Sequence, residues 1–127
     1  MQGEEIKDLV VAALDDAKGE QLSVLDVREL TSITDWMVVV SGRSDRHVKA
    51  LSDAVLERAR AADVRPIGVE GQRGGEWVLV DFADVLVHVM LPRVRDFYNL
   101  EKLWEIGKTA AAGSADRRKA QGAPQER

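Results

Sequence analysis

The chain has 127 residues, no cysteine and a formal net charge of −4 at pH 7. That length predicts one domain with a core of its own, and the lack of cysteine excludes disulfides, thiolate zinc sites and cysteine nucleophiles. An acidic chain is a poor ligand for nucleic-acid phosphates, because such binding depends on Lys and Arg, so a basic protein is the better-matched partner.

The first expected element is an amphipathic helix over residues 4–18, whose apolar residues recur at helical spacing. Gly19 stands where such a helix commonly ends in the left-handed conformation. The acidic start of the chain lacks the basic and apolar regions of a signal peptide, and no apolar run approaches the roughly 18 residues that span a bilayer. We expect a soluble, cytoplasmic protein.

Two strands and the longest helix are expected next. Residues 21–27 and 36–41 are rich in β-branched residues, and the second run is apolar enough for burial on both faces. A short polar segment then leads into a helical pattern over residues 45–62. In that segment we expect Gly42 to make the turn and Ser44 to cap the helix.

The same strand, glycine and helix arrangement also suggests a phosphate-binding loop. A P-loop needs a longer glycine-rich run ending in Gly-Lys-Ser/Thr, and a dinucleotide site needs three spaced glycines, whereas this turn has only Gly42. Helix caps of this kind far outnumber phosphate sites. A nucleotide-binding or nucleotidyltransferase-like enzyme that uses this turn is therefore kept as the alternative function.

Catalytic and metal-binding groups are sparse elsewhere. Metal-assisted nucleotidyl transfer needs converging carboxylates, but Asp81 and Asp84 are three residues apart and point to opposite faces of an extended chain. His88 has no nucleophile or acid at motif spacing, so we expect a satisfied, half-buried strand residue. The residues predict no catalytic site, no metal and no cofactor.

Three strands in a meander are expected after Pro66: a short one near residues 67–69, then an antiparallel hairpin of residues 77–82 and 84–90. One or two short helices follow Pro92. Taken in chain order, these elements predict an α/β fold, with a mixed β-sheet of about five strands flanked by helices.

The last twenty residues differ in composition from the rest. Residues 108–127 carry five basic and two acidic side chains, a balance of +3 that leaves about −7 on the remainder. From Thr109 onward there is no large apolar residue. We expect residues 108–127 to form a disordered basic tail, whose contact with RNA is minor if it occurs.

Alternation on the first strand of the hairpin puts Trp77, Leu79 and Asp81 on one face. The opposite face carries apolar residues only: Val78, Val80 and Phe82. Because both faces are apolar, one can serve the core and the other a partner. Tyr98 and Trp104 raise the same choice in the last helical segments, and core packing is the default for such residues.

Four blocks of the sequence together resemble one protein family. They are SITDWMVVVSGRSDRHVKAL at 32–51, GVEG at 68–71, WVLVDFADVLVHVM at 77–90 and FYNLEKLW at 97–104. In order and spacing they closely resemble the ribosomal silencing factor family, also called iojap-like proteins. The resemblance covers about residues 3–106, so we expect a domain of this family at 1–107, followed by the tail.

The resemblance implies a repressor of translation and not an enzyme. Members of the family bind the large ribosomal subunit through its fourteenth protein, on the intersubunit face, and sterically block joining of the small subunit when nutrients are scarce. They also act in large-subunit biogenesis and form homodimers when free. Their fold is similar to that of nucleotidyltransferases, which implies that the Gly42 turn keeps the shape of that scaffold without its metal-binding carboxylates.

Carried onto this chain, the family pattern points to a partner-binding set on the hairpin and the C-terminal aromatic segment: Trp77, Leu79, Asp81, Asp84, Tyr98 and Trp104. From side-chain chemistry we expect an apolar patch centred on Trp77. Glu70, Asp81 and Asp84 are expected to pair with basic groups of the ribosomal protein.

Overall fold

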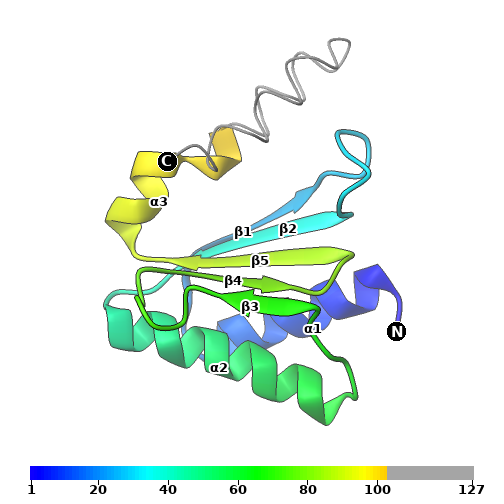
Figure 1. Cartoon of the computed structure of the whole chain (residues 1–127), viewed down its shortest axis with the longest axis horizontal. Coiled ribbons are helices and arrows are strands. Elements are labelled where there is room, and N and C mark those ends of the chain that lie inside the picture. The colour runs from blue at the N-terminus through cyan, green and yellow to red at the C-terminus, as the bar shows by residue number, and fades with distance from the viewer. Residues whose placement is uncertain (103–127) are drawn as a thin grey trace.

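The computed structural model describes residues 1–102 and shows an α/β fold (Figure 1). Its five-stranded sheet has the order β1-β2-β5-β4-β3. The elements are α1 (Gly3–Asp16), β1 (Glu20–Asp26), β2 (Trp36–Ser41), α2 (Asp45–Ala61), β3 (Gly68–Glu70), β4 (Trp77–Asp81), β5 (Val85–Met90) and α3 (Pro92–Tyr98). The expected mixed sheet of about five strands is confirmed.

Strand pairing makes the sheet mixed. β2 and β5 run parallel, whereas β1 with β2, β4 with β5 and β3 with β4 are antiparallel. Helices α1 and α2 lie side by side on one face, and α3 crosses one end of the other face (Figure 1). The expected hairpin and three-strand meander are confirmed, and residues 1–102 cover the second face only in part.

The main core lies between the sheet and the pair α1 and α2. Alternate positions on the three central strands point to this side and are valines no more than 1% exposed: Val38, Val40, Val78, Val80, Val87 and Val89. They pack against helical positions three to four residues apart: Val10 and Leu14 on α1, and Leu51 and Val55 on α2. Each such burial contributes about 1.5 kcal/mol or more to folding.

The other face of β2 is also buried, as its composition predicts. Met37 and Val39 belong to a second cluster with Val27, Met90 and Leu100. This cluster lies under the C-terminal segment, so the described chain closes one half of the second face over β1 and β2. Within residues 1–102, no helix is long and apolar enough to cross a membrane.

The end of α1 corrects one expectation. Lys18, and not Gly19, adopts the left-handed backbone, with a φ of 65°. The amide of Gly19 donates to the carbonyl of Leu14 at 2.8 Å and that of Lys18 to Asp15 at 3.0 Å, which is a Schellman ending. A Cβ on Gly19 would lie 2.5 Å from Cγ2 of Val40. Glycine is needed there so that the chain can pass close to β2.

Arg95 holds α3 against the sheet. Its side chain is only 9% exposed and forms a two-pronged ion pair with Glu101, with both contacts at 2.9 Å. The same guanidinium donates to Ser41 Oγ at 2.9 Å and to Ser23 Oγ at 3.2 Å. The hydrogen bond from Arg95 is the main reason why the pKa of Glu101 lies below its usual range. These contacts join α3 and residue 101 to β1 and β2.

Candidate functional site

The residues of β4 alternate between positions that face the core and positions on the open second face of the sheet, as alternation predicts. Val78, Val80 and Phe82 are at most 5% exposed. Trp77, Leu79 and Asp81 are half-buried on the side away from α1 and α2. Cross-strand pairing aligns Leu79 with Glu70 on β3 and with His88 on β5, so the three share this side.

Aromatic rings gather where α3 meets this open face. The ring centres of Trp77 and Tyr98 are 4.7 Å apart, and those of Tyr98 and Phe97 are 5.0 Å apart in an edge-to-face arrangement. Phe97 is 71% exposed, although it is a large apolar residue. The last turn of α3 thus extends the apolar surface of β4, and we call Trp77, Leu79, Phe97 and Tyr98 the aromatic patch.

His88 lies beneath the aromatic patch. Trp77 Nε1 donates a hydrogen bond to His88 Nδ1 at 3.0 Å, and the two ring centres are 5.9 Å apart. Burial lowers the pKa of His88 from its ordinary value of 6.5 to about 4. Its Nε2 has no hydrogen-bond partner among the described residues. The expectation of a satisfied, half-buried histidine is therefore wrong in two respects: His88 is only 7% exposed, and one of its nitrogens is unpaired.

A small depression of about 260 Å³ opens beside the patch. Its lining residues are Glu70, Gly71, Trp77 and Leu79. Gly71 has a φ of +88°, and a Cβ there would overlap the carbonyl oxygen of Trp77. The turn that follows β3 can lie this close to β4 only because residue 71 has no side chain. The depression offers an apolar wall with a carboxylate at its edge.

The structure brings some of the predicted site residues together and separates others. Trp77, Leu79 and Tyr98 belong to the patch, and Glu70 lines the depression beside it. Asp81 lies farther along the same face of β4, and its Oδ1 accepts a hydrogen bond from the Ala83 amide at 2.7 Å. Asp84 is exposed in the turn after β4, against Gly3 at the start of α1. Asp84 is thus at the opposite end of the strand from Trp77.

Some predictions concern residues outside the described part of the chain, and some site residues were not predicted. Trp104, the boundary after residue 107 and the tail at 108–127 lie outside residues 1–102. Sequence reasoning did not assign Phe97 or His88 to the site. The hairpin register, which places His88 opposite Leu79 on the open face, was the signal that could have found His88.

The turn between β2 and α2 is occupied by its own side chains. Ser44 Oγ accepts from the His47 amide at 3.1 Å, which confirms the expected cap, and His47 Nδ1 accepts from the Arg43 amide at 3.0 Å. Gly42 lies in the turn against Val48, where a Cβ would come within 2.9 Å of the Val48 amide nitrogen. The turn therefore uses its polar groups to cap the helix.

The hollow beside this turn has a volume of about 560 Å³, and its two arginines already form ion pairs. Arg43 pairs with Glu20 at 2.9 Å, and Arg93 pairs with Glu76 at 3.0 Å. Among residues 1–102, no three His, Asp or Glu side chains are grouped as metal ligands. Nothing in this geometry favours the phosphate-binding alternative.

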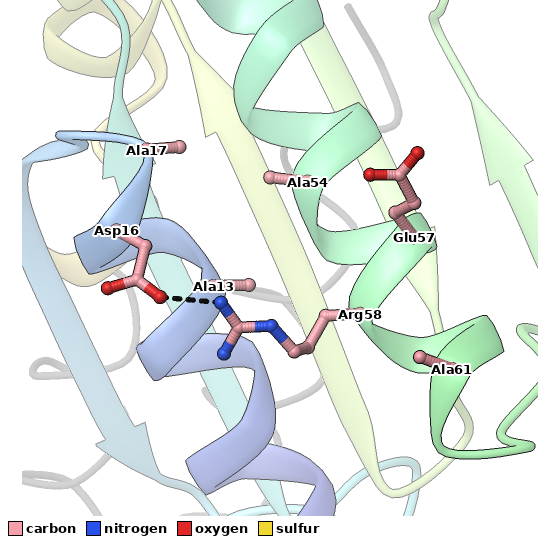
Figure 2. A pocket seen from close by; sticks show the side chains of 7 residues that line it. All are labelled: Ala13, Asp16, Ala17, Ala54, Glu57, Arg58 and Ala61. Atoms are coloured by element: carbon pink, nitrogen blue, oxygen red, sulfur yellow. Dashed lines mark hydrogen bonds and ion pairs between the residues drawn. The ribbon is translucent and has the colours of Figure 1, made fainter.

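A third hollow separates α1 from α2 (Figure 2). Its volume is about 430 Å³, and small side chains floor it: Ala13, Ala17, Ala54 and Ala61. Arg58 of α2 reaches across to Asp16 of α1 at 2.5 Å, while Glu57 stands at the rim (Figure 2). The ion pair joins the two helices, and the hollow is far from the aromatic patch, on the other face of the sheet.

Comparison with known proteins agrees with the resemblance of the four blocks. The family model described as "Ribosomal silencing factor during starvation" matches residues 2–127. Ribosomal silencing factor RsfS of Chromobacterium violaceum is 49% identical over 115 residues, which are 91% of this chain and 94% of that protein. A mouse protein named mitochondrial assembly of ribosomal large subunit protein 1 is 31% identical over 102 residues, 78% of this chain and 45% of its own.

A solved structure agrees with the fold as well. A crystal structure of a Chromobacterium violaceum protein superposes with a TM-score of 0.81 at 48% identity, covering 83% of this chain and 88% of that one. The family model matches nearly the whole sequence. The superposition shows that the solved structure shares the overall fold described above. The chain belongs to the ribosomal silencing factor family.

Proposed function

We propose that this protein represses translation by binding the large ribosomal subunit through its fourteenth protein, using the aromatic patch on the open sheet face. The observation that carries the proposal is the patch itself: Trp77, Tyr98 and Phe97 remain accessible on an otherwise well-packed domain. Exposed apolar surface of this kind marks interaction sites. Family membership supplies the ribosome as the partner.

The charges around the patch fit a basic partner. Glu70, Asp81 and Asp84 have no ion-pair partner among residues 1–102, whereas Asp16 and Glu76 are paired with arginines. A carboxylate at the edge of an apolar centre, as Glu70 is, steers and orients a cationic surface, while the aromatic rings provide the desolvated centre. Asp81 farther along β4 and Asp84 in the turn after it extend the acidic surface away from the patch. The acidic body of the chain adds to this attraction.

Repression then follows because the bound protein occupies space that the small subunit needs for joining. A protein of 14.0 kDa that sits on an intersubunit surface blocks joining if its binding free energy matches that of joining at cellular concentrations. No chemical step is required. Binding to the same subunit also suits a role in large-subunit biogenesis, in line with the name of the mouse relative.

The first experiment is co-sedimentation of the full chain with isolated large and small subunits, with subunit joining measured alongside. We expect binding to the large subunit alone, and fewer joined ribosomes as the protein concentration rises. If the protein bound neither subunit at concentrations at which a family member from another organism saturates the large subunit, the proposal would be rejected.

Trp77→Glu is expected to weaken large-subunit binding by about 30-fold or more, because it puts a charge at the centre of the patch and removes its largest ring. Ile33→Glu is the matched control. Ile33 is 65% exposed in the loop before β2, away from the patch, so the same change there should leave binding intact. Circular dichroism must show both variants folded. A folded Trp77→Glu variant with wild-type affinity would move the site elsewhere.

We also propose that the free protein is a symmetric homodimer that covers the same patch, so that dimerisation competes with ribosome binding. The contiguous rings of Phe97, Tyr98 and Trp77 support this, because a contiguous exposed apolar patch commonly marks an interaction site. The chain has no cysteine, so one introduced cysteine can lock a dimer covalently. The locked dimer is expected to lose large-subunit binding and to regain it on reduction. Full affinity in the locked state would contradict a shared surface.

A further inference from the structure

The hydrogen bond between Trp77 and His88 determines the form of the imidazole. An indole N–H can only donate, so His88 Nδ1, at 3.0 Å, must be an unprotonated acceptor. The ring is then neutral and carries its proton on Nε2. That Nε2–H is buried and has no partner among the described residues. A buried donor without an acceptor costs free energy of folding.

Packing alone does not explain a histidine at this position. On the same face its cross-strand neighbours are Val39 on β2 and Leu79 on β4, and both are apolar. A leucine or methionine at residue 88 would fill similar volume and leave no unpaired polar group. What the imidazole supplies, and an apolar side chain does not, is an acceptor for the indole of Trp77.

We infer that His88 is a positioning residue of the partner-binding surface, which holds the Trp77 indole in the orientation that the ribosomal partner meets. The inference rests on the proposed function. His88 fixes the indole nitrogen from below, and Tyr98 packs against the same ring system at 4.7 Å. Without the acceptor, the indole N–H of this half-buried side chain has to turn toward water, and the ring leaves its place against Tyr98.

When the Trp77 ring is already held in one orientation, its conformational entropy is lost on folding and not on association, so the partner binds more tightly. Immobilising a side chain at an interface lowers affinity by a factor that reaches about tenfold. His88 does not touch the partner in this arrangement, since it is 7% exposed beneath the patch. Its effect on binding should therefore pass entirely through Trp77.

The test compares His88→Leu with His88→Asn. The Oδ1 of asparagine is bonded to Cγ as Nδ1 is in histidine, so His88→Asn keeps an acceptor for the indole, whereas His88→Leu removes it. We expect His88→Leu to bind large subunits about tenfold more weakly, with an unfolding midpoint in urea that is unchanged or raised. We expect His88→Asn to bind within about threefold of wild type, because the acceptor is restored.

A spectroscopic readout separates positioning from loss of structure. In the ¹⁵N-labelled protein, the indole N–H signal of Trp77, assigned by its absence in Trp77→Phe, should exchange slowly with water in wild type and in His88→Asn. In His88→Leu it should move toward the position of a free indole and exchange fast.

Each other outcome overturns the inference. Wild-type affinity of His88→Leu would show that Trp77 needs no fixing, and the proposed function would still stand on Trp77→Glu. A loss of both stability and binding in His88→Leu, without rescue by His88→Asn, would show that His88 is only structural. Wild-type binding by folded Trp77→Glu would remove the proposed site, and the role of His88 with it.

Discussion

Arg95→Ala is expected to lower the free energy of unfolding by about 3 kcal/mol, because it removes one partner of a largely buried ion pair and strands the other. The guanidinium makes four hydrogen bonds, two to Glu101 and one each to Ser41 and Ser23. Its side chain is 9% exposed and that of Glu101 is 25% exposed, so water replaces little of what is lost. Urea unfolding followed by circular dichroism measures the difference.

Arg93→Ala is the control on the same helix. The Arg93 side chain is 64% exposed and pairs with Glu76 at the surface, so its removal should change the free energy of unfolding by less than about 1 kcal/mol. Similar small losses in the two variants would contradict the assigned role of Arg95, because burial is what distinguishes them.

The same variant has a consequence for the binding face. α3 has seven residues, too few for a helix that is stable alone, so its position depends on docking. Arg95 supplies the polar part of that docking, and Val94 and Leu100 the apolar part. When Arg95 is removed, Tyr98 should lose its place against Trp77, and large-subunit binding should weaken together with stability.

Periodicity was enough to predict the fold class, because each element has its own pattern. The valines of β2, β4 and β5 alternate or run continuously, while α1 and α2 repeat at helical spacing. Alternation on β4 also placed Trp77 and Leu79 on one face and predicted that the two faces would have different roles. The proposed partner came from the resemblance of the four blocks, since no pattern of residue types names a ribosomal protein.

Contacts between distant residues were beyond the reach of local patterns. Arg95 meets Ser41 and Ser23 across 54 and 72 residues of sequence, which no periodicity records. The contact between Trp77 and His88 is diagonal across the hairpin, since Trp77 pairs directly with Met90. Gly19 was misread for a related reason: its lack of a side chain serves the approach to Val40, a residue of another element.

Acid is expected to destabilise this protein through His88, well above the pH at which most carboxylates titrate. Burial lowers the pKa of His88 to about 4, whereas the unfolded chain has the ordinary value of 6.5. Below pH 6.5 the unfolded state therefore binds a proton at His88 that the folded state does not bind. The free energy of unfolding falls as the pH drops from about 6.5 through about 4. The full loss is about 3 kcal/mol, at roughly 1.4 kcal/mol per pH unit.

The difference between wild type and His88→Leu isolates this contribution. The pKa of Glu101 is lowered chiefly by its hydrogen bond from Arg95, so protonation of this and similar carboxylates at low pH destabilises both proteins. Their contributions are the same in the two proteins and cancel in the comparison. Unfolding free energies measured in urea from pH 7.5 to 4.5 should fall more steeply for wild type than for the variant, so that the two profiles diverge as the pH drops. Two parallel profiles would contradict the buried neutral imidazole. Because the folded state refuses the proton until about pH 4, Nδ1 remains an acceptor for Trp77 throughout the neutral range, and the bond that orients the indole does not depend on pH there.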